Sequence, residues 1–257
     1  MDYSLKHQSE RWDEVGHTDP LGNMLWHPDG EAWDYEALME TGRREIQDVL
    51  DRVRTAGLTV GTGRALDFGC GIGRLTQALC THFDTVDGVD ISASLLEMAR
   101  QRNTYPDRCA YHLNTSDALP MFEAGTFDFI YSFGTLQYVP APVVERYLAA
   151  FARLLAPGGV LVFQLPTGRP SGRMKRLASY LLPLEGYRSL RYIYWPEIRY
   201  GTRPDFRLYG VSRPKVERYL TTFGLQIADV AVSARRGWVS CLYVAALSPA
   251  RHAPASP

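Results

Sequence analysis

A glycine-rich loop behind a carboxylate is the stretch of this chain whose residue types and spacing best fit ligand chemistry. Asp67 comes two residues before the first of three glycines at alternate positions, Gly69, Gly71 and Gly73. Glycines allow positive φ and let a ligand lie against the main chain. A helix that begins directly after them offers unpaired N–H groups and a partial positive charge. The loop therefore predicts a ligand site between a strand and a helix.

Three ligand classes use loops of this kind, and the residues around the glycines separate them. A phosphate-binding P-loop ends in Gly-Lys-Ser/Thr, whereas this loop ends in Gly73-Arg74-Leu75. A dinucleotide fingerprint needs its third glycine three residues after the second, and the spacing here is two. Asp67 would repel a pyrophosphate but suits a ligand that carries an ammonium group. A glycine-rich turn that binds nothing stays open as an alternative.

Two further acids follow the loop. Asp90 lies at the end of an apolar stretch, 23 residues after Asp67. A carboxylate there can accept hydrogen bonds from both ribose hydroxyls, but NAD-binding folds use the same placement, so this acid alone does not separate the ligands. Asp117 lies in a loop, where an Asx turn is the alternative to a ligand contact. A helix cap or an exposed surface position is the corresponding alternative for Asp90.

The elements that position these residues alternate between strand and helix. We expect strands over 64–68, 85–90, 109–113, 127–133 and 160–165, and helices over 73–82, 93–101 and 143–155. Strands separated by helices predict a parallel sheet with helices on both faces, whose ligands bind beyond the carboxyl ends of the strands. A helix over 214–223 and an antiparallel strand pair over 225–232 and 238–247 are expected to complete the sheet.

Four motif-like stretches in order resemble class I methyltransferases that depend on S-adenosylmethionine (SAM). They are the loop with Asp67, the segments 89–100 and 127–133, and the turn and strand of 154–161. The resemblance covers roughly 62–166 and implies SAM as cofactor. It implies a Rossmann-like α/β fold, with a seven-stranded sheet in the order 3-2-1-4-5-7-6 and an antiparallel seventh strand. The cofactor-binding residues that it implies are Asp67, Gly69, Cys70, Gly71, Asp90, Ile91, Asp117, Ala118 and Phe133.

The chain is expected to divide into five segments. They are an N-terminal lid with helices over 1–57, a SAM-binding core over 58–166, an inserted basic and aromatic cap over 167–210, the C-terminal part of the core over 211–248, and a disordered tail over 249–257. Residues 1–30 are expected to be irregular, because turn formers alternate with large aromatics. Residues 31–56 are expected to form a helix broken near Gly42.

Charge and composition limit the partners. The 257 residues carry a formal net charge of zero, but residues 1–60 sum to −7 and residues 167–215 to +8. These segments are two solvated faces, or they face each other across a cleft, or the basic one meets an anionic partner. The neutral balance and missing RNA motifs argue against nucleic acid. Residues 174–184 are candidates for contact with a membrane surface.

The sequence shows no pattern typical of a secretory signal, a membrane-spanning helix or a metal site. The N-terminus has no apolar signal region, and no apolar run approaches the roughly 20 residues of a spanning helix. Four cysteines without metal-ligand spacing predict free thiols in a reducing cytoplasm. No metal site is expected.

The predicted activity is methyl transfer from SAM to a small-molecule acceptor in a biosynthetic pathway, with oxygen as the favoured acceptor atom. An oxygen nucleophile needs a base or close positioning. We select His27 as the candidate base and Tyr138 as the residue that hydrogen-bonds the acceptor. The cap's aromatics and arginines predict an aromatic or anionic acceptor. The alternatives are a SAM-binding protein without methyl transfer, other SAM-dependent chemistry, and methylation at nitrogen or carbon.

Overall fold

The computed structural model describes residues 4–18, 20–22, 33–168, 208–235 and 238–247. Its elements follow the chain as α1 (Leu5–Thr18), α2 (Tyr35–Thr55), β1 (Arg64–Phe68), α3 (Arg74–Leu79), β2 (Thr85–Asp90), α4 (Ala93–Gln101), β3 (Cys109–Leu113), β4 (Phe127–Ser132), η1 (Leu136–Tyr138), α5 (Ala141–Leu154), β5 (Leu155–Gly168), α7 (Arg213–Thr222), β6 (Leu225–Arg235) and β7 (Trp238–Leu247).

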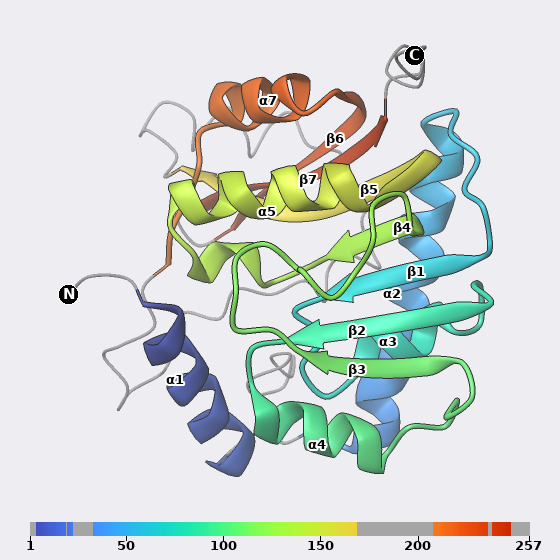
Figure 1. The fold of residues 1–257 in the computed structure, drawn as a ribbon, viewed down its shortest axis with the longest axis vertical. Helices are drawn as coiled ribbons and strands as arrows, with labels where there is room; N and C mark the ends of the chain where they lie inside the picture. Colours follow the sequence, from blue (N-terminus) through green and yellow to red (C-terminus); the bar gives the residue numbers. More distant parts are fainter. Residues whose placement is uncertain (1–3, 19, 23–32, 169–207, 236–237, 248–257) are drawn as a thin grey trace.

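Seven strands form one sheet in the order β3-β2-β1-β4-β5-β7-β6, which confirms the predicted order. The strands β1 to β5 pair in parallel. Strand β7 pairs antiparallel with both β5 and β6. The carboxyl ends of β1, β2, β3 and β4 therefore meet at one edge of the sheet, on the left in Figure 1.

Helices cover both faces of the sheet, and alternate strand residues divide between them. On one face, Leu66, Ile130 and Leu161 join the core cluster that includes residues of α5 and α7. On the other, Ala65, Phe129 and residues of α2, α3 and α4 form a second cluster. This division is the three-layer arrangement visible in Figure 1. It follows from the alternation of side chains along buried strands.

Two expectations for the N-terminal segment are wrong. Residues 5–18 form helix α1 instead of an irregular stretch, although Val15 is its only buried residue. Helix α2 runs unbroken through Gly42, because this glycine permits a close approach to the next helix. A Cβ at Gly42 would lie 2.6 Å from the carbonyl oxygen of Arg74.

Strand β5 is longer than expected at both ends. It continues through Pro166, which the sequence marks as the end of the pattern, because β7 pairs with it as far as Gly168. The chain returns beside this end, where the amide of Val211 donates to the carbonyl of Pro166 at 2.9 Å.

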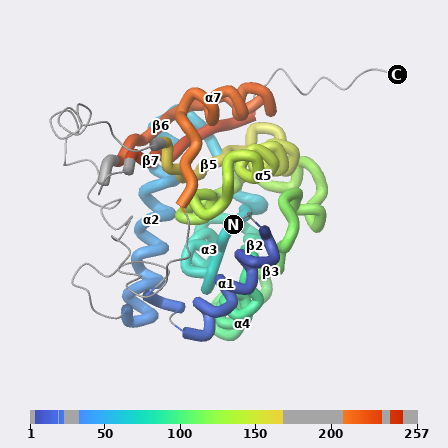
Figure 2. Tube along the Cα trace, turned by 90° about the vertical axis from the view of Figure 1, so that its left-hand side faces the viewer, coloured from blue at the N-terminus to red at the C-terminus, as the bar shows by residue number. Residues whose placement is uncertain are grey.

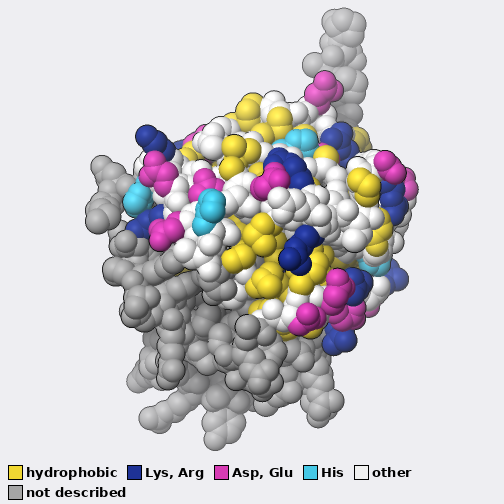
Figure 3. All heavy atoms as spheres, turned by 90° about the horizontal axis from the view of Figure 1, so that it is seen from below, with side chains coloured by type: hydrophobic (Ala, Val, Ile, Leu, Met, Phe, Trp, Pro, Cys, Tyr) yellow, Lys and Arg dark blue, Asp and Glu magenta, His cyan; other side chains and the backbone are white. Residues whose placement is uncertain are grey.

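Most of the predicted cap and the whole predicted tail lie outside the described residues. So do His27 and the candidate membrane-contact segment 174–184. Over the described part of the face in Figure 3, acidic and basic side chains mix around a small hydrophobic group. Within the described ranges, no helix is long and apolar enough to cross a membrane. The four cysteines are free and buried.

Candidate active site

The glycine loop joins β1 to α3 and takes left-handed backbone at each of its glycines. The φ angles are 82° at Gly69, 54° at Gly71 and 84° at Gly73. A Cβ at Gly69 would lie 1.9 Å from Oγ1 of Thr135, and one at Gly73 would lie 2.3 Å from the hydroxyl of Tyr111. The alternate spacing therefore reflects three backbone positions that other residues adopt only under strain.

Asp90 connects this loop to the start of α4. Its Oδ2 accepts from the amide of Gly71 at 2.8 Å, and its Oδ1 accepts from the amide of Ser92 at 2.9 Å. Burial raises the pKa of Asp90, although these backbone hydrogen bonds oppose that rise. Each carboxylate oxygen can accept more than one hydrogen bond. Asp90 thus keeps acceptor capacity beside the loop, at the carboxyl end of β2.

Asp67 lies beneath the loop and is almost fully buried, with 1% of its surface exposed. Its Oδ2 accepts from the hydroxyl of Thr76 at 2.7 Å. Its Oδ1 is buried and has no hydrogen-bond partner in the part of the chain that the structure describes. Burial raises the pKa of Asp67 to about 7. One oxygen is therefore left for a donor that these residues do not supply.

A buried ion pair fixes the helix that follows the loop. Nη2 of Arg74 lies 2.9 Å from Oε2 of Glu45, and both side chains are only 8% exposed. The hydroxyl of Tyr131 donates to Oε1 of Glu45 at 2.8 Å. The pair joins α2, α3 and β4. Our sequence reasoning missed it, although Glu45 falls seven residues after Leu38 on the apolar stripe of α2, where an acid signals a buried partner.

Asp117 lies in the segment between β3 and β4 and forms an ion pair with Arg146 of α5. Asn114, directly after β3, is 4% exposed, and its backbone amide donates to the backbone carbonyl of Asp90 at 2.9 Å. The side chain of Asn114 makes Asx-type contacts with Ser116, the kind of contact that is the alternative reading for Asp117. Ala118, next to Asp117, is exposed. The adenine roles of Asp117 and Ala118 stay predictions.

The other predicted cofactor residues lie around the same edge. Cys70 is buried, with its sulfur toward the Cα of Gly88, so the loop exposes its backbone rather than its thiol. Ile91 follows Asp90 and is half-buried. Phe133 follows β4, is half-buried, and stacks on Tyr131 with ring centroids 6.3 Å apart.

Tyr138 lies in η1, just beyond the carboxyl end of β4. Its ring meets that of Trp12 edge to face, with centroids 5.1 Å apart. The amide of Tyr209 donates to the carbonyl of Gln137 at 2.8 Å, so the end of the predicted cap also reaches this point. The structure therefore brings aromatic side chains from distant segments to the β4 end of the site.

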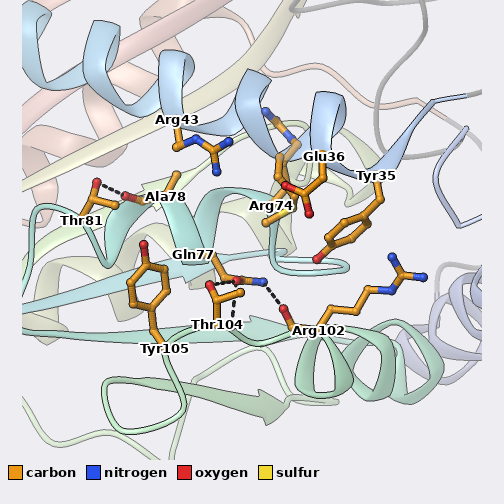
Figure 4. Close-up of a pocket in the computed structure, with 11 residues that line it drawn as sticks. Tyr35, Glu36, Arg43, Arg74, Gln77, Ala78, Thr81, Arg102, Thr104 and Tyr105 are labelled. Carbon is orange, nitrogen blue, oxygen red and sulfur yellow. Dashed lines mark hydrogen bonds between the residues drawn. The ribbon is translucent and has the colours of Figure 1, made fainter.

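A separate hollow of about 60 Å³ lies between α2, α3 and residues 102–105. Figure 4 shows arginine and tyrosine side chains around it, with the amide of Gln77 bonded to Thr104 and Arg102. None of the predicted site residues lines it. In the described ranges, no three His, Cys, Asp or Glu side chains gather in a way that could hold a metal ion.

Comparisons with known proteins agree on one family. Residues 65–159 match a family model described as a methyltransferase domain. The chain is 32% identical to trans-aconitate 2-methyltransferase of Variovorax paradoxus, over 61% of this chain and 64% of that protein. It is 31% identical to ubiquinone biosynthesis O-methyltransferase of Methylococcus capsulatus, over 67% of each. It thus spans about two thirds of the length of these relatives.

A solved structure has a similar fold. Magnesium protoporphyrin IX methyltransferase of Synechocystis with bound S-adenosylhomocysteine (SAH) matches with a TM-score of 0.61 and 17% identity. The match covers 95% of this chain and 99% of that one.

Proposed function

Since the chain belongs to the class I SAM-dependent methyltransferases, we propose that it methylates an oxygen atom of a small-molecule acceptor. SAM is its methyl donor. The observation that carries the proposal is the carboxylate of Asp90, which sits beside the glycine loop with acceptor capacity to spare. The choice of oxygen is supported by the relative named as an O-methyltransferase.

The residues beside the loop fit the parts of SAM. Asp90 is assigned to the ribose hydroxyls, because a carboxylate can accept from two donors at once. The buried, unpartnered oxygen of Asp67 and the backbone of Gly69 to Gly71 are assigned to the amino-acid part, whose ammonium group supplies donors. Ile91, Asp117 and Ala118 are assigned to the adenine.

The side chain of Phe133 is assigned to the wall of the cofactor pocket. Cys70 is assigned to the pocket through its backbone. Bound SAM supplies a methyl group that its sulfonium already activates. The protein then has to align the acceptor oxygen and exclude water, because transfer requires a collinear approach of the reacting atoms.

The acceptor is assigned to the β4 end of the site. Trp12 and Tyr138 offer an apolar, aromatic wall there. The hydroxyl of Tyr138 orients the acceptor by a hydrogen bond to its oxygen. His27 is the proposed base that takes the proton from the acceptor hydroxyl, which makes the oxygen a better nucleophile. His27 lies outside the described residues, so its role rests on the sequence alone.

The test is a transfer assay with SAM labelled in its methyl group and a panel of phenols, catechols, carboxylic acids and amines. We expect labelled product from an oxygen acceptor, with the methyl position located by mass spectrometry and NMR. Product methylated only at nitrogen or carbon would contradict the choice of oxygen. Binding of SAM without turnover on any acceptor would favour the non-catalytic alternative.

A further inference from the structure

Helix α1 lies across the carboxyl edge of the sheet. Ser9, within the helix, contacts the residues after β2, where its hydroxyl donates to the carbonyl of Ile91 at 2.8 Å. The other contact is the ring of Trp12 on that of Tyr138, after β4. In the sheet, β1 and its glycine loop lie between β2 and β4. Figures 1 and 2 show α1 beyond the strand ends, crossing in front of them when they are viewed end on.

Asp13 is the centre of this docking. Its Oδ1 accepts from the hydroxyl of Ser92 at 2.9 Å and from the amide of Ser94 at 3.0 Å. The hydroxyl of Ser94 donates to the carbonyl of Asp13 at 2.9 Å. A carboxylate from a segment about 80 residues away therefore caps the first turn of α4, where orphan N–H groups favour negative charge.

The surface of α1 is shaped for this contact. A Cβ at Gly16 would lie 2.2 Å from Oγ of Ser94, 2.9 Å from its Cβ and 3.2 Å from the amide nitrogen of Leu95. Glycine in a helix interior costs stability relative to alanine. Its presence at this position is explained by the close approach of the two helices.

Ser92 links this docking to the cofactor site. Its hydroxyl donates to Asp13, while its amide donates to Oδ1 of Asp90 at 2.9 Å. Ile72 of the glycine loop belongs to the apolar cluster against which Trp12 packs. The same helix therefore contacts the segment that follows Asp90, the apolar cluster that includes Ile72, and Tyr138 at the proposed acceptor side.

We propose that Asp13 is a positioning residue, which latches α1 over the cofactor by holding Ser92 in the geometry that Asp90 needs. The inference rests on the proposed assignment of Asp90 to the ribose. Because Ser92 serves both carboxylates, docking of α1 and binding of the cofactor stabilise each other. Such coupling is reciprocal, so the cofactor must also hold α1 closed. The docked helix then presents Trp12 to the acceptor beside Tyr138.

Calorimetric titration with SAH tests the latch on the full chain. We expect Asp13→Ala to weaken SAH binding about tenfold, since several hydrogen bonds to a charged acceptor are lost. Asp13→Asn keeps one oxygen acceptor and is expected to fall between Asp13→Ala and wild type. Glu10→Gln is the matched control, because Glu10 lies on the same helix in an exposed pair with Lys6. Its SAH affinity should equal that of wild type.

Hydrogen exchange provides the readout that a purely structural role would not move. SAH should slow amide exchange of residues 9–16 in wild type and in Glu10→Gln, but not in Asp13→Ala. Gly16→Ala is an independent variant, because it leaves Asp13 intact, favours the helix itself, and pushes α1 off Ser94. It should reproduce the loss of affinity and of protection without lowering the melting temperature of the core.

The outcomes separate the two proposals. If wild type does not bind SAH, the proposed function fails. If wild type binds SAH but Asp13→Ala and Gly16→Ala bind it equally well, the latch is overturned. Equal protection of α1 with and without SAH in wild type would also overturn it.

Discussion

Replacing Glu45 tests whether its buried ion pair with Arg74 stabilises the glycine loop. In Glu45→Ala the guanidinium of Arg74 stays buried but loses the carboxylate 2.9 Å away. The hydroxyl of Tyr131 loses its acceptor at the same time. Breaking a buried ion pair by removing one partner costs about 3–5 kcal/mol, because the remaining charge is left uncompensated. Arg74 is the first residue of α3, directly after Gly73, so the cost falls on the loop.

The melting temperature is the direct readout. For a chain of this size, a loss of 1 kcal/mol lowers the melting temperature by about 2–4 °C. Glu45→Ala should therefore melt roughly 6–20 °C below wild type in a circular dichroism scan. Glu45→Gln should lose less, because its amide oxygen can still accept from Tyr131 or Arg74.

Glu40→Ala is the matched control. Glu40 lies on the same helix and also pairs with two arginines, Arg43 and Arg44, but these side chains are exposed. Exposed pairs contribute little, so this variant should melt close to wild type. Equal melting temperatures for Glu45→Ala and Glu40→Ala would refute the idea that the buried pair supports the loop.

Two further predictions concern the loop. Burial raises the pKa of Asp67 to about 7, and the ionised form is the one that binds an ammonium group, so SAH affinity should fall about tenfold per pH unit below 7. Calorimetry from pH 5.5 to 8 should show this slope in wild type, and Asp67→Asn should flatten it; a slope unchanged in the variant would assign it to another group. Gly69→Ala should lower the melting temperature far more than Gly57→Ala, because both need left-handed backbone but only a Cβ at Gly69 meets Thr135. Equal losses in the two variants would mean that Thr135 moves aside.

The sheet could be predicted from the sequence because the residue patterns of its strands are strong and local. The stretches 127–132 and 160–165 are rich in apolar residues, many of them β-branched or aromatic, and turn residues bound them. The family resemblance then ordered the strands, which periodicity alone does not do. The glycine loop and Asp90 lie at strand ends, so a correct sheet brings them to one edge.

The features that sequence reasoning missed depend on contacts between distant segments. Helix α1 has little apolar periodicity, since Asp13, Gly16 and Ser9 dock it by polar contacts and close approach. Gly42 looks like a helix breaker in the sequence. In the structure its missing Cβ leaves room for the carbonyl of Arg74.

The residues that follow β3 show the same limit. Asp117 and Asn114 are three residues apart in one loop, and only the fold reveals that Arg146 pairs with the first while the backbone amide of the second donates to the carbonyl of Asp90. A local pattern gives the loop, but which residues of that loop pair with distant segments depends on partners elsewhere in the chain.

Calorimetric titration of the purified chain with SAH, in wild type and Asp90→Ala, tests the central claim most directly. The account predicts one binding site in wild type and affinity about a hundredfold lower or more in Asp90→Ala, because two charge-assisted hydrogen bonds are lost. Asp84→Ala, an exposed acid just before the other end of β2, should bind as wild type does. Absence of binding to wild type, or unchanged affinity in a folded Asp90→Ala, would contradict it.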